Sequence, residues 1–291
     1  KPVTIGHNYS CVIYLTGQKT WALPLAIDRV STSVKETVFG VNQWCEIIKD
    51  KNNNFQDKRC VGVFDSAYSS AYCIAAFNDN QPNDAVLIAR LRGNRVLQRP
   101  YTGVKNKKGR PAIFDHNNTF DLKNENTWGD PIQSSSCSWT TKKGKEQTVH
   151  INLWDNLRMS GHHDAKIQET PLMVARITVR DQSGELVYAR ALWTVIAGVW
   201  PTDWPITHIW DNYHLRFDAE HFFRFGKSHL LLVDHQSSIA LNEENWKQFC
   251  MISYHQLYHA RKLVANVKKK WETKKTKSDE VLSPSRVQRG M

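Results

Sequence analysis

A short, uninterrupted apolar run, Cys60–Phe64 (CVGVF), constrains the fold of this chain more than any other feature. Such a run fits a strand that is buried on both faces, with Asp65 at its C-terminal tip. Residues 66–77 then show helical spacing of apolar side chains, and Ala85–Leu91 (AVLIARL) is the next strand-like run. This alternation predicts an α/β domain.

The segment before this strand is typical of a hairpin followed by a helix. Ser10–Leu15 and Trp21–Ile27 have the pattern of two strands joined at residues 16–18. Ser31 and Thr32 are candidate N-caps of a helix that reaches about residue 48. Apolar residues recur along this helix at three- and four-residue steps, and we expect them to cover the sheet: Val34, Val38, Val41, Cys45 and Ile48.

From residue 92 to about 205, turn-rich sequence separates short strand-like runs. The clearest are Thr148–Leu153, Leu172–Val179 and Leu186–Ile196, the last two joined across a turn at residues 181–184. Helical spacing returns from Ile206 to Lys227 and from Glu243 to Trp271. We therefore expect an α/β core formed by residues 1–91 and 206–271, a β-rich insertion at 92–205, and a basic, flexible tail at 272–291.

The composition indicates a polyanionic partner, either nucleic acid or an anionic membrane surface, of which the membrane is the weaker option. Thirty-nine Lys and Arg against 28 Asp and Glu give a formal net charge of +11, and the pI is near 9.3. No run approaches the 18 or so apolar residues of a spanning helix, and the N-terminal residues lack the apolar region of a signal peptide. We therefore expect a cytoplasmic protein that binds a polyanion. The six cysteines, which form no CxxC pair, are interpreted as reduced, buried and structural.

Four polar residues stand at a fixed spacing in the predicted helix that begins near Ile206. They are Tyr213, Arg216, Glu220 and Lys227, a Tyr-x2-Arg-x3-Glu-x6-Lys pattern. At 100° per residue the last three lie about 60°, 20° and 40° behind Tyr213, so all four share one narrow stripe. A carboxylate between two cations suits a metal-bound phosphodiester, because the carboxylate can hold a divalent ion while Arg and Lys bind phosphate. Tyr can hydrogen-bond a phosphate oxygen or stack.

Structural interpretations of the same residues remain open. Arg216 and Glu220 have the spacing of an ordinary i,i+4 salt bridge on a surface helix. Asp65 could simply cap a following helix. The fourfold spacing, together with the basic pI, favours the functional interpretation.

The Tyr-Arg-Glu-Lys pattern resembles the signature of bacterial insertion-sequence transposases with a DDE triad and an RNase H-like fold. The segments KPVTIGHNYS and RFDAEHFFRFGK also resemble one subgroup of these proteins, and the resemblance covers nearly the whole chain. It implies an RNase H-like mixed sheet interrupted by a β-rich insertion, and Asp65 and Glu220 as catalytic ligands of two Mg²⁺ or Mn²⁺ ions. Tyr213, Arg216 and Lys227 would position transposon-end DNA. The resemblance further implies cut-and-paste cleavage and strand transfer by a dimer on double-stranded DNA.

The first Asp of the triad is the point at which this chain departs from the family pattern. The family carries it just upstream of a segment like KPVTIGHNYS, and no Asp precedes Asp28 here. We interpret Asp28 as a strand-end residue paired with Arg29. The chain is therefore expected to be cut off before its first catalytic carboxylate, and to bind DNA but cleave it poorly. Two alternatives stay open: an inactive DNA-binding remnant of a transposase, and a basic nucleic-acid-binding protein without nuclease ancestry.

Several other residues are candidates for weaker roles. Residues 161–164 (GHHD) could bind a metal, but a solvated turn fits better because no partner stands at ligand spacing. For each of the other candidates, a DNA contact and an ordinary structural role are both open. Trp193, Trp200 and Trp204 could stack on a DNA base or pack in the core. Arg90, Arg92 and Arg95 could line a DNA groove or a solvated edge, and Lys268, Lys269, Lys270, Lys274, Lys275 and Lys277 could contact phosphates or only add solubility.

Overall fold

The computed structural model describes residues 7–18, 20–55, 57–82, 84–103, 113–141, 144–159, 170–235, 237–267 and 281–291. The chain forms two compact units. Unit 1 comprises Lys1–Gly40 and Leu215–Met291, and unit 2 comprises Val41–His214. Each unit is described by itself.

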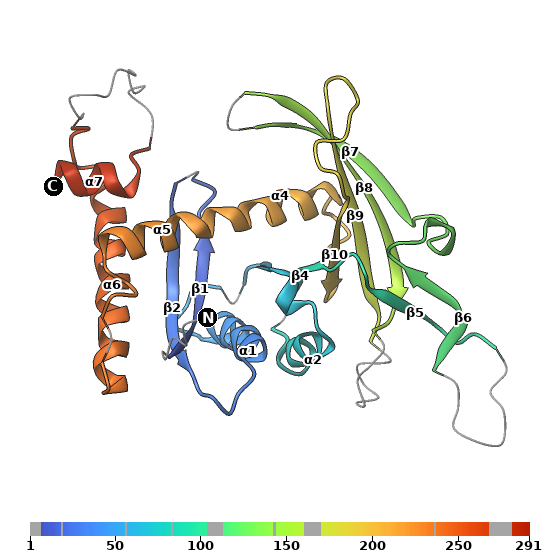
Figure 1. Ribbon diagram of the computed structural model, residues 1–291, viewed down its shortest axis with the longest axis horizontal. Coiled ribbons are helices and arrows are strands. Elements are labelled where there is room, and N and C mark those ends of the chain that lie inside the picture. Colours follow the sequence, from blue (N-terminus) through green and yellow to red (C-terminus); the bar gives the residue numbers. More distant parts are fainter. Residues whose placement is uncertain are drawn as a thin grey trace, which may run out of the picture. The chain divides into compact units, whose positions relative to one another are not determined.

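Unit 1 contains the predicted hairpin. Strands β1 (Asn8–Leu15) and β2 (Ala22–Val30) pair antiparallel, with Ser10 opposite Asp28 and Tyr14 opposite Leu23 (Figure 1). The turn contains Gly17 at φ 70°, a conformation that glycine adopts readily. The register shifts between Val12 and Ile13, next to Pro24, which cannot donate to the ladder.

Three helices complete unit 1: α5 (Ala219–His229), α6 (Ala240–Ala260) and α7 (Pro284–Gly290). Their apolar faces and the hairpin form one core, which includes Trp21, Ile27, Phe222, Phe225, Tyr254, Leu257 and Val287. The expectation of a flexible tail from residue 272 onward is wrong for α7, because Pro284 opens this helix and Val287 is fully buried. Residues 272–280 lie outside the described chain, as do residues 1–6.

Helix α1 (Glu36–Lys49) begins four residues after the candidate cap Thr32, and the unit boundary falls within it. Val41, Cys45 and Ile48 are buried, as the spacing predicted, and Trp44, which the spacing did not include, is buried as well. Val34 precedes the helix and is 41% exposed, so the prediction that it belongs to this face is wrong.

Unit 2 is built on a six-stranded mixed sheet in the order β3-β4-β10-β9-β8-β7 (Figure 1). Helix α2 (Ala71–Asn80) connects β3 to the parallel strand β4, whereas β10 pairs antiparallel with β4. A separate hairpin pairs β5 with β6. The strands are β3 (Cys60–Phe64), β4 (Ala85–Leu91), β5 (Val96–Pro100), β6 (Phe114–Asp121), β7 (Gln133–Thr140), β8 (Glu146–Leu157), β9 (Leu172–Asp181) and β10 (Leu192–Ala197).

This sheet confirms a mixed α/β fold but not the predicted division of the chain. The prediction placed residues 92–205 in a separate insertion, yet β10 pairs with β4 and continues the sheet of β3 and β4. The hairpin of β1 and β2 was expected in one core with β3, but it belongs to the other unit. The predicted strand Leu186–Ile196 begins only at Leu192, and Leu186 and Tyr188 are about half exposed.

Two apolar layers cover the sheet of unit 2. On one face, β4, β8, β9 and β10 pack against α4 (Thr207–Leu215) and Ile206 through a large apolar cluster. A second cluster consists of aromatic rings, with centroids 5.0–6.0 Å apart, from Phe120, Trp128, Trp154 and Trp193.

The close approach of α1 to β3 requires glycine at position 62. A Cβ atom there would lie 2.6 Å from the Trp44 ring and 2.7 Å from the Phe64 ring. Trp44 cannot yield easily, because it is 8% exposed and its ring stacks on Phe77. We expect Gly62→Ala to lower the free energy of unfolding by about 1–3 kcal/mol, measured by urea denaturation. Gly93→Ala is the matched control, since its Cβ meets nothing within 4 Å, and an equal loss in both variants would contradict the packing argument.

Candidate functional site

Asp65 lies directly after β3, where the sequence placed it. It is exposed, and it caps the short 3-10 helix η1 (Ser66–Tyr68) by accepting a hydrogen bond from the Ala67 N–H through Oδ1, at 2.8 Å. The capping role that the sequence left open is therefore present. A cap uses one carboxylate oxygen, so the role is compatible with a metal ligand at the other oxygen.

Glu220 lies in the first turn of α5 and is exposed. Within the described part of the chain it forms no ion pair, so the alternative of an Arg216–Glu220 salt bridge is not observed. The guanidinium of Arg216 instead lies 4.8 Å from the centre of the Phe217 ring. The Glu220 carboxylate remains accessible to a ligand.

One exposed face of α5 carries two of the four residues of the predicted stripe, Glu220 and Lys227. Glu220 and Lys227 are seven residues apart, so they lie about 20° from each other around the helix. Both are exposed, as are Phe223 and Arg224 between them. The opposite face is buried in the core of unit 1 through Phe222, Phe225 and Gly226. Sequence reasoning missed Arg224, although its i+4 spacing from Glu220 was visible.

Tyr213 does not belong to this face, which corrects the predicted four-residue stripe. It is 2% exposed and packs in the core of unit 2 with Ile209 and Trp210. A 3-10 turn, η3 (Arg216–Asp218), separates α4 from α5. Because a 3-10 turn advances by about 120° per residue, it breaks the phase on which the stripe was predicted.

Asp65 belongs to unit 2 and Glu220 to unit 1, so their convergence on shared metal ions stays a prediction. Neither unit supplies a complete metal cage among its described residues, where no group of three or more His, Cys, Asp or Glu could hold an ion. Both side chains are accessible carboxylates, the hard oxygen ligands that Mg²⁺ and Mn²⁺ prefer. The donor chemistry therefore fits the metals that the sequence implied.

The candidate tryptophans have different surroundings. Trp193 is 5% exposed and belongs to the aromatic cluster on the sheet, so core packing, the structural alternative for this residue, is confirmed and base stacking is not. Trp200 and Trp204 are half-buried, with ring centroids 5.7 Å apart. Arg59 lies 5.8 Å from the Trp204 ring centre and bonds to Asp203 through both carboxylate oxygens. Trp204 keeps a partly exposed edge.

The candidate arginines cluster at the end of β4. Arg90 and Arg92 are exposed, and Arg92 stands in the turn that leads to β5. Arg95 is half-buried and donates to the Ser69 carbonyl at 3.5 Å. Arg90 and Arg92 are thus accessible to a polyanion, whereas Arg95 also supports the loop that precedes α2. The GHHD segment and the lysine run at 268–277 lie outside the described residues.

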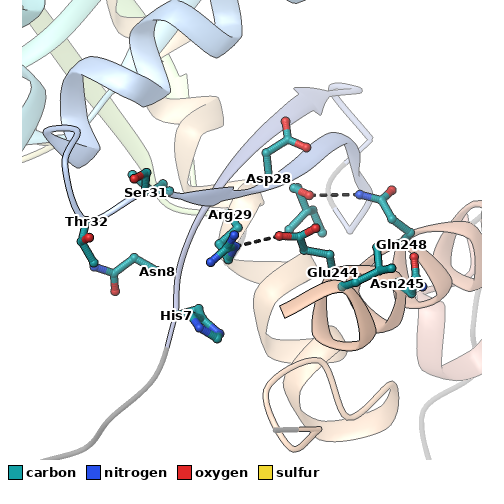
Figure 2. A pocket seen from close by; sticks show the side chains of 12 residues that line it. His7, Asn8, Asp28, Arg29, Ser31, Thr32, Glu244, Asn245 and Gln248 are labelled. Carbon is teal, nitrogen blue, oxygen red and sulfur yellow. Dashed lines mark hydrogen bonds and ion pairs between the residues drawn. The ribbon is translucent and has the colours of Figure 1, made fainter. Parts of the chain in front are cut away.

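A polar pocket of 540 Å³ separates β2 from the N-terminal half of α6 (Figure 2). Figure 2 shows Arg29 directed at Glu244, with its Nε 2.7 Å from a carboxylate oxygen, and Gln248 bonded to the Ile27 carbonyl at 3.0 Å. Arg29 therefore pairs with Glu244, not with Asp28 as predicted, and β2 continues past Asp28 to Val30. One arginine beside two carboxylates makes this pocket a poor phosphate site.

A network of polar side chains, buried at Glu243 and Lys247 and exposed at His7, connects the residue before β1 to α6. His7 Nδ1 lies 2.8 Å from a Glu243 carboxylate oxygen, and Lys247 Nζ lies 3.8 Å from Glu243. Burial alone would raise the pKa of Glu243, but the His7 hydrogen bond and the Lys247 charge lower it below its usual value. Lys247 also donates to the Leu232 carbonyl. The sequence signal was the i,i+4 spacing of Glu243 and Lys247, which is not specific for burial.

The cysteines play no visible part in a site. All six are free thiols, and none is exposed. Burial raises the pKa of Cys45 to about 11 and that of Cys11 to about 12, with a smaller contribution from Asp28 at Cys11. Thiols with such pKa values remain protonated near neutral pH and are poor nucleophiles.

Comparison with known proteins adds no family assignment, because no protein-family model matches the chain and no curated protein matches it. Among the described residues, each helix is too short or too polar to cross a membrane.

Proposed function

We propose that this chain is a metal-dependent DNA-processing protein. More specifically, we propose that it is the catalytic core of a DDE transposase with an RNase H-like fold. The observation that carries the proposal is an accessible acid on each of the two expected elements: Asp65 at the end of β3, and Glu220, which shares one exposed face of α5 with Lys227. A carboxylate beside a lysine on one helical face suits a metal-bound phosphodiester.

The order of elements supports the RNase H-like proposal. A hairpin and a helix precede β3, and α2 connects β3 to the parallel strand β4. The helix that carries Glu220 comes after the antiparallel strands β7 to β10. This is the order that the family resemblance implies, with the acids at the end of a core strand and on a late helix.

In this proposal each side chain has one task. Asp65 and Glu220 would hold the divalent ions, Mg²⁺ or Mn²⁺. When bound, these ions would activate water or a DNA 3′-hydroxyl and stabilise the leaving oxygen of the phosphodiester. Lys227 would neutralise a backbone phosphate near Glu220, and Arg216 would bind another through its guanidinium. Arg90 and Arg92 would add phosphate contacts.

The proposed partner is double-stranded DNA, at transposon ends and at the target, bound by a dimer in the bacterial cytoplasm at the nucleoid. The net charge of +11 supports a polyanionic partner. Unit 1 carries most of this charge, with 18 Lys and Arg against 10 Asp and Glu, compared with 21 against 18 in unit 2. The excess charge thus lies in the unit that carries α5.

Binding to a duplex tests this proposal through its salt dependence. We expect the chain to bind a labelled duplex, and Lys227→Gln to reduce the slope of log K against log salt by about 0.9, because one phosphate contact is lost. Fluorescence anisotropy over a range of salt concentrations measures the slope. Lys51→Gln, at an exposed lysine of unit 2, is the matched control and should leave the slope unchanged.

Two results would count against the proposal: no binding of the duplex at low salt, or equal slopes for the two lysine variants.

A further inference from the structure

The exposed face of α5 carries an aromatic ring between its charged side chains. Phe223 is 36% exposed and lies between Glu220 and Lys227 along the helix. Its ring centroid lies 5.4 Å from that of Phe222, which is fully buried in the core of unit 1. The Phe223 ring is therefore supported by the core and still reaches solvent. An aromatic side chain with few rotatable bonds loses little conformational entropy when it stacks on another ring.

Two cations lie on the same face. Arg224 and Lys227 are exposed, and neither forms an ion pair among the residues that the structure describes. Around the helix, Phe223 lies about 60° to one side of Glu220 and Arg224 lies about 40° to the other side. Lys227 lies about 20° from Glu220, so the four side chains occupy an arc of about 100°. An acid, an aromatic ring and two cations are thus accessible to one ligand.

The combination of ring and cations is typical of proteins that bind a single nucleic-acid strand. In such proteins cations bind the phosphates, and bases stack on aromatic rings. Arg224 and Lys227 lie about 6 Å and about 10 Å beyond Glu220 along the axis of α5. At ~3.4 Å per nucleotide, this length corresponds to about three nucleotides of one strand. In an intact duplex each base is stacked between its neighbours, so Phe223 requires an unpaired base.

The other aromatic candidates lack this arrangement. Tyr213, which the sequence predicted on the same face, is buried in unit 2. Trp204 is half-buried, and its ring already lies beside the Trp200 ring and the Arg59 guanidinium. Phe249 is 63% exposed on α6, but no charged residue stands three or four positions from it. The ring on α5 is therefore the best placed of these side chains to meet a base beside accessible cations.

We therefore propose that α5 binds a DNA strand that contains an unpaired base. Phe223 stacks on this base. Arg224 and Lys227 bind phosphates of the same strand, beyond the phosphate nearest to Glu220. The preferred substrate is thus DNA with an unpaired segment, such as an overhanging end, rather than a fully paired duplex. The inference rests on the proposed function, since it requires this face of α5 to meet DNA.

Two DNA probes that differ only in the bases of an unpaired extension test the stacking. Both contain the same duplex, and one strand extends at each end by three thymidine nucleotides or by three abasic nucleotides, which carry the same phosphates. We expect the full chain to bind the thymidine probe about tenfold more tightly, and Phe223→Ala to bind both probes alike, since stacking on a base accounts for the difference. Fluorescence anisotropy measures the dissociation constants. Phe249→Ala, at the exposed ring of α6, is the matched control and should keep the preference.

Arg224→Gln separates the phosphate contact from the stacking. We expect this variant to keep the tenfold preference but to reduce the slope of log K against log salt by about 0.7 for both probes, because one phosphate contact with a single strand is lost. Arg190→Gln, at an exposed arginine of unit 2, is the matched control and should leave the slope unchanged. Circular dichroism checks that each variant is folded.

The outcomes distinguish this inference from the proposed function. Equal binding of the two probes by the wild-type chain, or a preference that survives in folded Phe223→Ala, would overturn the inference and leave the proposed function standing. A preference that Phe249→Ala also removes, or a slope that Arg224→Gln leaves unchanged, would overturn it as well. If neither probe bound at low salt, both the inference and the proposed function would fail.

Discussion

We expect Fe²⁺, bound in place of Mg²⁺, to cut the polypeptide of the full chain at two places, beside Asp65 and beside Glu220. The reaction is started with peroxide and ascorbate. Hydroxyl radicals formed at a bound iron attack only the chain close to the ion. If the two carboxylates share metal ions, one site produces both cuts, although 155 positions separate the residues (220 − 65). Gel electrophoresis of the end-labelled chain measures the cut positions.

The decisive result comes from the single variants. Asp65→Asn is expected to reduce the cut beside Glu220 by about tenfold or more, and Glu220→Gln the cut beside Asp65, since each removes a ligand of the shared ions. Asp130→Asn is the matched control, because it removes an exposed carboxylate of unit 2 and should change neither cut. If each variant affected only the cut at its own position, the two carboxylates would not share metal ions, and the transposase proposal would fail.

The strands that the sequence predicted best are those with the strongest local signal. Cys60–Phe64 and Ala85–Leu91 have the predicted bounds, because an uninterrupted apolar run is a strong local signal of a strand. The prediction that Cys60–Phe64 is buried on both faces is wrong, since β3 is the end strand of its sheet and only its Gly62 is buried. The hairpin of β1 and β2 could also be predicted from the sequence, since its two strands pair across a short turn. Local patterns suffice when the partner is close in the chain.

Long-range pairing and local breaks in periodicity were not predictable in this way. The pairing of β4 with β10 joins residues about 100 positions apart, and no local pattern encodes that choice of neighbour. The 3-10 turn at Arg216–Asp218 interrupts a segment whose apolar spacing looked continuous. Helix α7 was missed because its seven residues, PSRVQRG, contain only two buried residues, Pro284 and Val287.

In the candidate site, too, the features set by the local sequence were predictable and those set by long-range packing were not. Sequence reasoning identified residue types and positions on elements, and the exposure of Asp65, Glu220 and Lys227 agrees with those assignments. It could not decide burial, which depends on packing between distant segments. Tyr213 was therefore assigned to DNA contact, and base stacking stayed open beside core packing for Trp193, although both side chains are buried in unit 2.

Replacing Trp21 with Ala is expected to lower the free energy of unfolding by about 3–5 kcal/mol. Trp21 is fully buried in unit 1, and its ring centroid lies 5.3 Å from those of Tyr254 and Tyr258 on α6. Its indole N–H donates to the Leu282 carbonyl at 2.7 Å, which joins the hairpin to the segment before α7. Urea denaturation followed by far-ultraviolet circular dichroism measures the loss.

Trp21→Phe separates ring packing from the hydrogen bond. Phe keeps most of the aromatic contact with Tyr254 and Tyr258 but leaves the carbonyl of half-buried Leu282 without its indole donor, so we expect a smaller loss of about 1–3 kcal/mol. If Phe cost as much as Ala, the hydrogen bond to residue 282 would be the main contribution, and the C-terminal segment would be essential to unit 1. If Ala cost less than about 1 kcal/mol, the core that holds the hairpin against α6 and α7, and so supports α5, would not have the packing described above.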